Sequence, residues 1–144
     1  WGEVIRSFSQ VEWQIYPKIY GLAERAWNNR SVLTLGDYNQ LVYEVFLPQL
    51  AESNRNFHIQ QPGILANDLH VTMNKVMTKG QILYRIDNSD WMTYEQPFTL
   101  SETAEIIQAK VKYLGKESNT TWLWMKDEHE VNTENQEQNT SATF

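Results

Sequence analysis

The spacing of apolar residues changes at one point in the chain, and this change restricts the possible folds more than any other feature. Up to residue 56, apolar residues recur every three or four positions, whereas from residue 64 to residue 125 they alternate with polar ones. The first pattern is typical of amphipathic helices and the second of half-buried strands. Gln61-Pro62-Gly63 separates the two regions. Helices followed by strands, without alternation, predict an α+β chain with two separate packing units.

Three helical stretches are predicted in the first region. The capping-box spacing of Ser9 and Glu12 indicates that a short helix begins there and runs to about residue 15. Pro17 fits the first turn of a second helix, which we expect to end at Trp27. One face of this second helix carries apolar side chains at helical spacing, which we expect to form a buried stripe. These side chains are Ile19, Leu22, Ala23, Ala26 and Trp27.

A third helix is expected to begin near Thr34, where Asp37 completes an imperfect capping box. Its apolar face comprises Tyr38, Leu41, Val42, Val45 and Phe46. Pro48 has no N–H group for the helical hydrogen-bond ladder, so we expect a kink or a late break at that point.

The second region predicts strands that each present one apolar face. The apolar positions are Leu69, Val71 and Met73; Ile82, Tyr84 and Ile86; and Ile107, Ala109, Val111 and Tyr113. Turns are expected at residues 88–89 and 114–115, and a last strand over residues 121–125. Several short antiparallel strands of this kind predict a small β-sandwich. Residues 126–144 hold one basic and five acidic side chains and almost no apolar ones, so we expect an acidic disordered tail there.

Composition excludes several classes of function. The 12 basic and 18 acidic side chains give a net charge of -6, which argues against a nucleic-acid partner. The absence of cysteine excludes disulfides, thiol catalysis and cysteine-ligated zinc. His58, His70 and His129 are too scattered for a metal site, and no cofactor is expected. No apolar run approaches the ~20 residues of a membrane span.

The first three residues form a candidate sugar site. The indole face of Trp1 suits the C–H side of a sugar ring, and the carboxylate of Glu3 would project to the same side of a strand. That carboxylate can accept hydrogen bonds from sugar hydroxyls. The alternative is a frayed terminus with an exposed aromatic side chain. The chain begins at Trp1 without an initiator methionine, so we expect that an N-terminal portion has been removed.

Four short segments then occur in a fixed order and spacing. They are Trp1-Gly2-Glu3, Gln10-Val11-Glu12, Tyr16-Pro17-Lys18 and Leu22-Ala23-Glu24-Arg25-Ala26-Trp27. This series resembles the end of the catalytic barrel in glycoside hydrolase family 20, the β-N-acetylhexosaminidases and chitobiases. Lys18 stands where the family usually has arginine. The second region is similar to the small β-sandwich at the C-terminus of chitobiase-like members, whose usual turn appears here as Tyr84-Arg85-Ile86-Asp87-Asn88.

The resemblance implies an architecture. Residues 1–60 would be the end of the last strand and the final helices of a (β/α)8 TIM barrel, and residues 64–125 an immunoglobulin-like β-sandwich. The upstream barrel would be part of the same protein, because 144 residues are too few for a complete barrel. Glu24 would have a structural role, in a hydrogen bond or in an ion pair with Arg25.

The resemblance also implies an activity, the removal of terminal non-reducing N-acetylhexosamine from chitooligosaccharides or other glycans, without a metal. Trp1 would form a wall of the sugar pocket, and Glu3 would bind the sugar's hydroxyls. The family's catalytic Asp-Glu pair would lie upstream, since the only such dipeptide here, Asp127-Glu128, is in the acidic tail. The isolated chain is therefore expected to be inactive. The family's usual substrates imply an extracytoplasmic protein.

The competing interpretation is a non-catalytic module that binds carbohydrate or packs against another domain. Trp122 and Trp124 point to one face of the last predicted strand, and together with Trp91 they could form a platform for glycans. Aromatic side chains in strands more often pack in a core or between domains, and this interpretation is favoured for all three.

Overall fold

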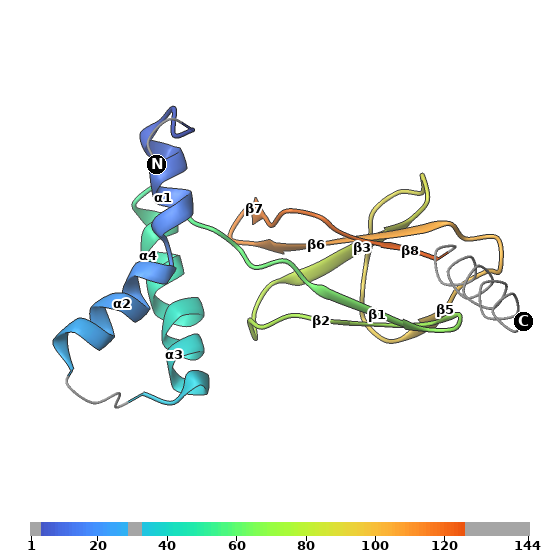
Figure 1. Ribbon diagram of the computed structural model, residues 1–144, viewed down its shortest axis with the longest axis horizontal. Helices are drawn as coiled ribbons and strands as arrows, with labels where there is room; N and C mark the ends of the chain where they lie inside the picture. Colours follow the sequence, from blue (N-terminus) through green and yellow to red (C-terminus); the bar gives the residue numbers. More distant parts are fainter. Residues whose placement is uncertain (1–3, 29–32, 126–144) are drawn as a thin grey trace, which may run out of the picture.

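The computed structural model describes residues 4–28 and 33–125. The chain forms two parts, a group of helices at one end and two antiparallel sheets at the other (Figure 1). The helices are α1 (Phe8–Ile15), α2 (Lys18–Trp27), α3 (Leu35–Leu41), the π-helical turn η1 (Val42–Phe46) and α4 (Leu47–Glu52). Helices thus precede strands, as the spacing of apolar residues predicted. The acidic tail predicted over 126–144 lies outside the described residues.

The first helix begins earlier than predicted. Ser7 is extended and its side chain accepts a hydrogen bond from the backbone N–H of Gln10, so Ser7 is the N-cap and α1 starts at Phe8. The predicted capping box between Ser9 and Glu12 is therefore wrong. Because Ser9 already lies within the helix, the Glu12 side chain is free to turn away from the helix end.

The third helix begins as predicted and continues through its proline. The capping box is formed in both directions: the Asp37 N–H donates to Thr34 Oγ1, and the Thr34 N–H donates to Asp37 Oδ2, each at 3.2 Å. Pro48 lies in the first turn of α4, directly after η1. The predicted kink or break is thus a π-helical turn, after which the missing N–H of Pro48 costs no regular helical hydrogen bond.

The strands form a three-stranded and a five-stranded antiparallel sheet, an arrangement compatible with a β-sandwich. The first has the order β1-β2-β5 and the second the order β4-β3-β6-β7, with β8 also paired to β6. Their bounds are β1 (Gly63–Asn67), β2 (His70–Asn74), β3 (Gln81–Ile86), β4 (Met92–Thr93), β5 (Phe98–Thr99), β6 (Ile106–Tyr113), β7 (Lys116–Glu117) and β8 (Thr121–Trp124).

The apolar faces of the strands lie where the alternation predicted. On β6 the side chains of Ile107, Ala109 and Val111 are fully buried. Each lies opposite an apolar residue of β3, for example Val111 opposite Ile82. The residues that alternate with these inner positions therefore form the outer face of the five-stranded sheet. The predicted turn at residues 114–115 is also present, with both residues at positive φ.

The helices and the sheets share a junction at the end of β6. The hydroxyl of Tyr113 donates a 2.6 Å hydrogen bond to the backbone oxygen of Tyr43 in η1. Phe57, which follows α4, is buried, and the Lys116 ammonium lies 5.4 Å from its ring centroid. Buried residues of both parts belong to one cluster. The prediction of two separate packing units needs this correction, because the two parts share a core where they meet.

Candidate functional site

The two residues predicted to touch sugar, Trp1 and Glu3, lie outside the described residues. Val4, the first residue that the structure describes, is exposed and precedes α1. What the structure contributes to this candidate site is therefore the anchoring of α1, the first helix after it.

A buried carboxylate anchors α1 to the segment that follows α4. Glu12 is 7% exposed. Its Oε1 accepts a 2.9 Å bond from Arg55 Nη1, and its Oε2 accepts a 3.0 Å bond from the Asn56 N–H. The Asn56 N–H lowers the pKa of Glu12 most, burial works in the opposite direction, and Arg55 lowers that pKa further. Glu12 is thus an ionised acceptor with both oxygens engaged, which suits a structural role and not that of a proton donor.

Further contacts along the same segment strengthen this anchor. The Asn56 side-chain amide donates to both the backbone oxygen and the hydroxyl of Ser9, at 3.1 and 3.0 Å. The His58 N–H donates to the Tyr16 carbonyl at 3.0 Å, and the His58 ring meets Trp13 edge-on at 4.8 Å. Burial lowers the pKa of His58, and Lys18 lowers it further. Segment 55–58 therefore holds α1, and Tyr16 directly after it, in place.

The helices expose a surface that the sequence predicted to be buried. Trp27 is 85% exposed and Leu22 66% exposed, and Ile19 is also exposed. No residue of α2 is buried. The prediction of a buried stripe on α2 is wrong for this chain, because the other helices pack against only part of α2. Other apolar side chains of the helices are exposed as well, among them Phe8 on α1 and Leu35 on α3. We refer to Phe8, Ile19, Leu22, Trp27 and Leu35 as the helical apolar surface.

Glu24 lacks the partner that was predicted for it. Within residues 4–28 and 33–125 it makes no ion pair with Arg25, and its Oε1 is shielded from solvent without a hydrogen bond. Gly21, Glu24 and Tyr38 line a cavity of about 270 Å³ between α2 and α3. The carboxylate therefore has an open acceptor position at the edge of the helical part.

A second candidate site lies on the outer face of the five-stranded sheet. Trp122 is 61% exposed and Trp124 55% exposed, so packing in the core of this chain is wrong for these two, whereas packing between domains stays a prediction. Trp91 is half-buried on the same face, where it packs against two cationic side chains of the outer face. Arg85 Cζ lies 5.0 Å, and Lys110 Nζ 4.2 Å, from the Trp91 ring centroid.

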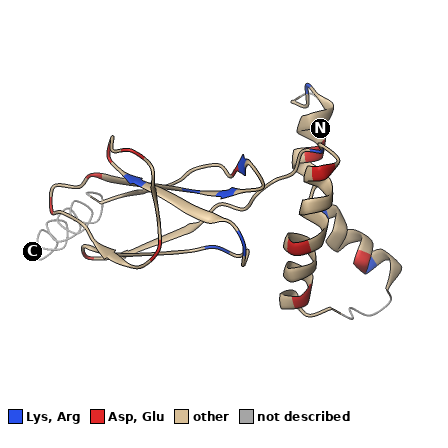
Figure 2. Ribbon diagram, turned by 180° about the vertical axis from the view of Figure 1, so that it is seen from behind, with Lys and Arg blue, Asp and Glu red and all other residues tan. Residues whose placement is uncertain are grey.

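The described residues give little support for a metal site, a nucleic-acid site or a membrane span. In the described part of the chain, no group of three or more His, Asp or Glu side chains could hold a metal ion; His129 lies outside it. Figure 2 shows acidic and basic residues interspersed along both the helices and the strands, with no continuous basic stripe over the residues drawn in colour. None of the described helices is long and apolar enough to cross a membrane.

Comparison with known proteins gives one informative relationship. No family model matches the chain. The chain is similar to N,N'-diacetylchitobiase of Vibrio harveyi, with 22% identity over 139 aligned residues that include 81% of this chain. The alignment covers 16% of the length of that relative. The similarity indicates a distant chitobiase-like relationship.

Sequence reasoning missed the anchor and the setting of Trp91. Glu12 and Arg55 are 43 positions apart, and a contact at that distance leaves no local pattern in the sequence. Arg85 and Lys110 could have been assigned to one outer face by the alternation of β3 and β6. Trp91 precedes the short strand β4, where no periodic signal indicated its position.

Proposed function

We propose that this chain is the C-terminal part of a β-N-acetylhexosaminidase of glycoside hydrolase family 20. The observation that carries the proposal is the similarity of 81% of the chain to N,N'-diacetylchitobiase. In this proposal residues 1–60 complete the TIM barrel, residues 64–125 form the immunoglobulin-like sandwich and residues 126–144 form the tail. The substrate is a chitooligosaccharide or another glycan that ends in N-acetylhexosamine. The protein acts outside the cytoplasm, where such glycans occur.

The helical apolar surface supports this architecture. Large apolar side chains exposed together are the usual sign of a surface that another polypeptide segment covers. Trp27, Leu22 and Phe8 are each more than 60% exposed in this chain. In the proposal the upstream barrel covers them. The open acceptor position of Glu24, in the same helical part, would then receive a donor from the barrel.

The chemistry is substrate-assisted hydrolysis with retention. The 2-acetamido oxygen of the substrate attacks the anomeric carbon, while an upstream glutamic acid protonates the leaving glycosidic oxygen and its neighbouring aspartate orients the acetamido group. Water then opens the cyclic intermediate and restores both the acetamido group and the acid. In this proposal Trp1 and Glu3 hold the terminal sugar, and the Glu12 anchor fixes α1, the first described helix after them. The chain alone supplies no proton donor and is inactive.

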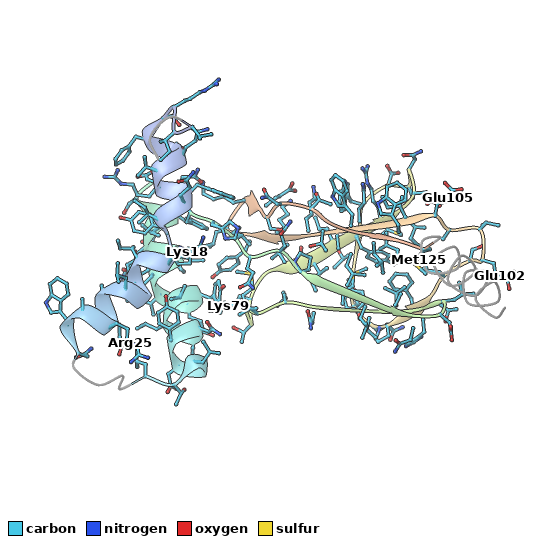
Figure 3. The ribbon with its side chains drawn as sticks, viewed as in Figure 1. Lys18, Arg25, Lys79, Glu102, Glu105 and Met125 are labelled. Atoms are coloured by element: carbon cyan, nitrogen blue, oxygen red, sulfur yellow. The ribbon has the colours of Figure 1, made fainter. Side chains whose placement is uncertain are left out.

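The test is to replace Glu3 in the longer protein. Loss of hydrogen bonds to a charged acceptor costs about 1.5–3 kcal/mol, so Glu3→Gln should lower kcat/KM on a chromogenic aryl N-acetyl-β-D-glucosaminide by roughly ten- to a hundredfold. Glu102→Gln is the matched control, because Glu102 is exposed at the end of the sheets far from the helices (Figure 3). Equal activity of the two variants would contradict the role of Glu3.

A non-catalytic glycan-binding module is the second candidate. The exposure of Trp122 and Trp124 favours it. The two functions are compatible within one longer protein.

A further inference from the structure

We propose that the outer face of the five-stranded sheet is a second, non-catalytic site for neutral oligosaccharides, built on Trp91, Trp122 and Trp124. We call it the tryptophan face. The choice of N-acetylglucosamine oligomers as its ligand rests on the proposed function; the existence of the face as a sugar platform does not.

The register of the sheet aligns the elements of this face. Trp122 lies opposite Gln108, and Gln108 lies opposite Arg85, so these three form one row across β8, β6 and β3. Neighbouring strands are about 4.8 Å apart, so the row spans roughly 10 Å. Trp91 lies over the Arg85 end of the row. Trp124 is two residues beyond Trp122, about 6.8 Å along the strand. Indole rings therefore flank the Gln108 side chain.

The polar groups of the row suit hydroxyl and amide ligands. Arg85 Nε donates to Gln108 Oε1, which fixes the amide in position. Across the described residues the Gln108 side chain makes no other hydrogen bond, so its amide N–H groups remain available as donors. A sugar ring stacked on an indole brings its C–H bonds to the electron-rich face and its hydroxyl or acetamido oxygens to the side. A donor between two rings is placed to meet those oxygens.

The charges favour a neutral ligand over an anionic one. Lys110 is already paired with Glu117 at 2.7 Å and also packs on Trp91. Arg85 packs on the same ring and bonds to Gln108. The cations of this face thus orient Trp91, and their charge is partly neutralised by Glu117. Nucleic acid needs a basic surface, whereas a neutral glycan needs stacking surfaces and donors.

The face lies apart from the helical apolar surface. Tyr113, which contacts the helices, is five residues from Gln108 on β6, a distance of about 17 Å. Met125, the residue after Trp124, lies at the end of the sheets opposite to the helices, next to Glu105 (Figure 3). A segment that covers α2 therefore does not need to cover the tryptophan face, which can remain open to a glycan.

The experiment is calorimetric titration of the 144-residue chain with chitohexaose, compared with cellohexaose and an oligodeoxythymidine. We expect chitohexaose to bind, and Trp122→Ala with Trp124→Ala to weaken binding by roughly tenfold or more, which corresponds to about 1.4 kcal/mol. Trp27→Ala is the matched control, because this indole is even more exposed than Trp122 and Trp124 but lies on α2, and it should leave the affinity unchanged.

A second measurement keeps the test independent of how the double variant folds. In ¹⁵N spectra of the unmodified chain, chitohexaose should shift the indole N–H signals of Trp91, Trp122 and Trp124 and leave those of Trp13 and Trp27 in place. The proposal would be overturned if neither sugar bound, if the double variant kept the affinity of the unmodified chain, or if the oligodeoxythymidine bound more tightly than the sugars. Binding of cellohexaose alone would support the sugar platform and overturn the choice of N-acetylglucosamine. Hydrolysis of a short soluble substrate by the longer protein is a separate readout, which the two substitutions should not change.

Discussion

The exposure of Trp27 leads to a quantitative prediction, that its removal barely changes the stability of this chain. The side chain is 85% exposed, so only about 15% of its surface is covered. An aromatic side chain offers roughly 150–250 Å², so the covered part is roughly 20–40 Å² and stabilises by about 0.5–1 kcal/mol. Alanine recovers up to about 0.7 kcal/mol of helix propensity. Trp27→Ala should therefore change the free energy of unfolding by less than about 1 kcal/mol.

The matched control is a buried aromatic residue of the same chain. Phe57 is 2% exposed and lies at the junction between the helices and the sheets. Phe57→Ala should cost about 3–5 kcal/mol, since it removes buried surface and leaves a cavity. Urea unfolding followed by circular dichroism measures both variants on one scale. A loss of more than about 2 kcal/mol for Trp27→Ala would mean that this ring is buried in the chain, and the account of the helical apolar surface would be refuted.

Three further predictions concern stability. The pKa of Glu12 is lowered on folding, so the contribution of its carboxylate to the free energy of unfolding is complete above the unfolded pKa near 4.5 and is lost as pH falls through the folded pKa. Glu12→Gln should therefore flatten that part of a curve of Tm against pH. Tyr113→Phe removes the bond to the Tyr43 carbonyl and should cost about 1 kcal/mol in urea unfolding; no change would mean that water replaces the bond. Gly80 has a φ of +85°, and a Cβ there would meet a backbone oxygen at 3.0 Å, so Gly80→Ala should strain the backbone and lower Tm. Gly36→Ala within α3 meets no such contact and should raise Tm slightly. Equal shifts of Tm in the two variants would contradict the backbone strain at Gly80.

The sequence predicted the helices and strands well where residues close in the sequence determine the local structure. The alternation along β6 gave the buried face because a strand in a two-layer arrangement must turn its apolar side chains inward. Thr34 and Asp37 gave the start of α3 because a capping box involves only residues three apart. Pro48 indicated an irregularity in the helix, but a π-helical turn and a break accommodate the lack of its N–H group equally well.

The site could be predicted only in part, because exposure depends on what else packs against a residue. The spacing of Ile19, Leu22 and Ala26 shows that α2 has an apolar face, but not that this chain covers it. The same holds for Trp122 and Trp124, whose alternation places them on one face without saying which face is buried. The bond between Glu12 and Arg55 arises only from the tertiary packing of α1.

The most direct test of the proposed function is an activity measurement on the longer protein that we propose contains this chain, beside the 144-residue chain alone. The substrate is chitobiose, and the quantity measured is the N-acetylglucosamine released. We expect release by the longer protein and none by the chain alone. Absence of release by a folded longer protein would contradict the claim, as would release by the 144 residues on their own.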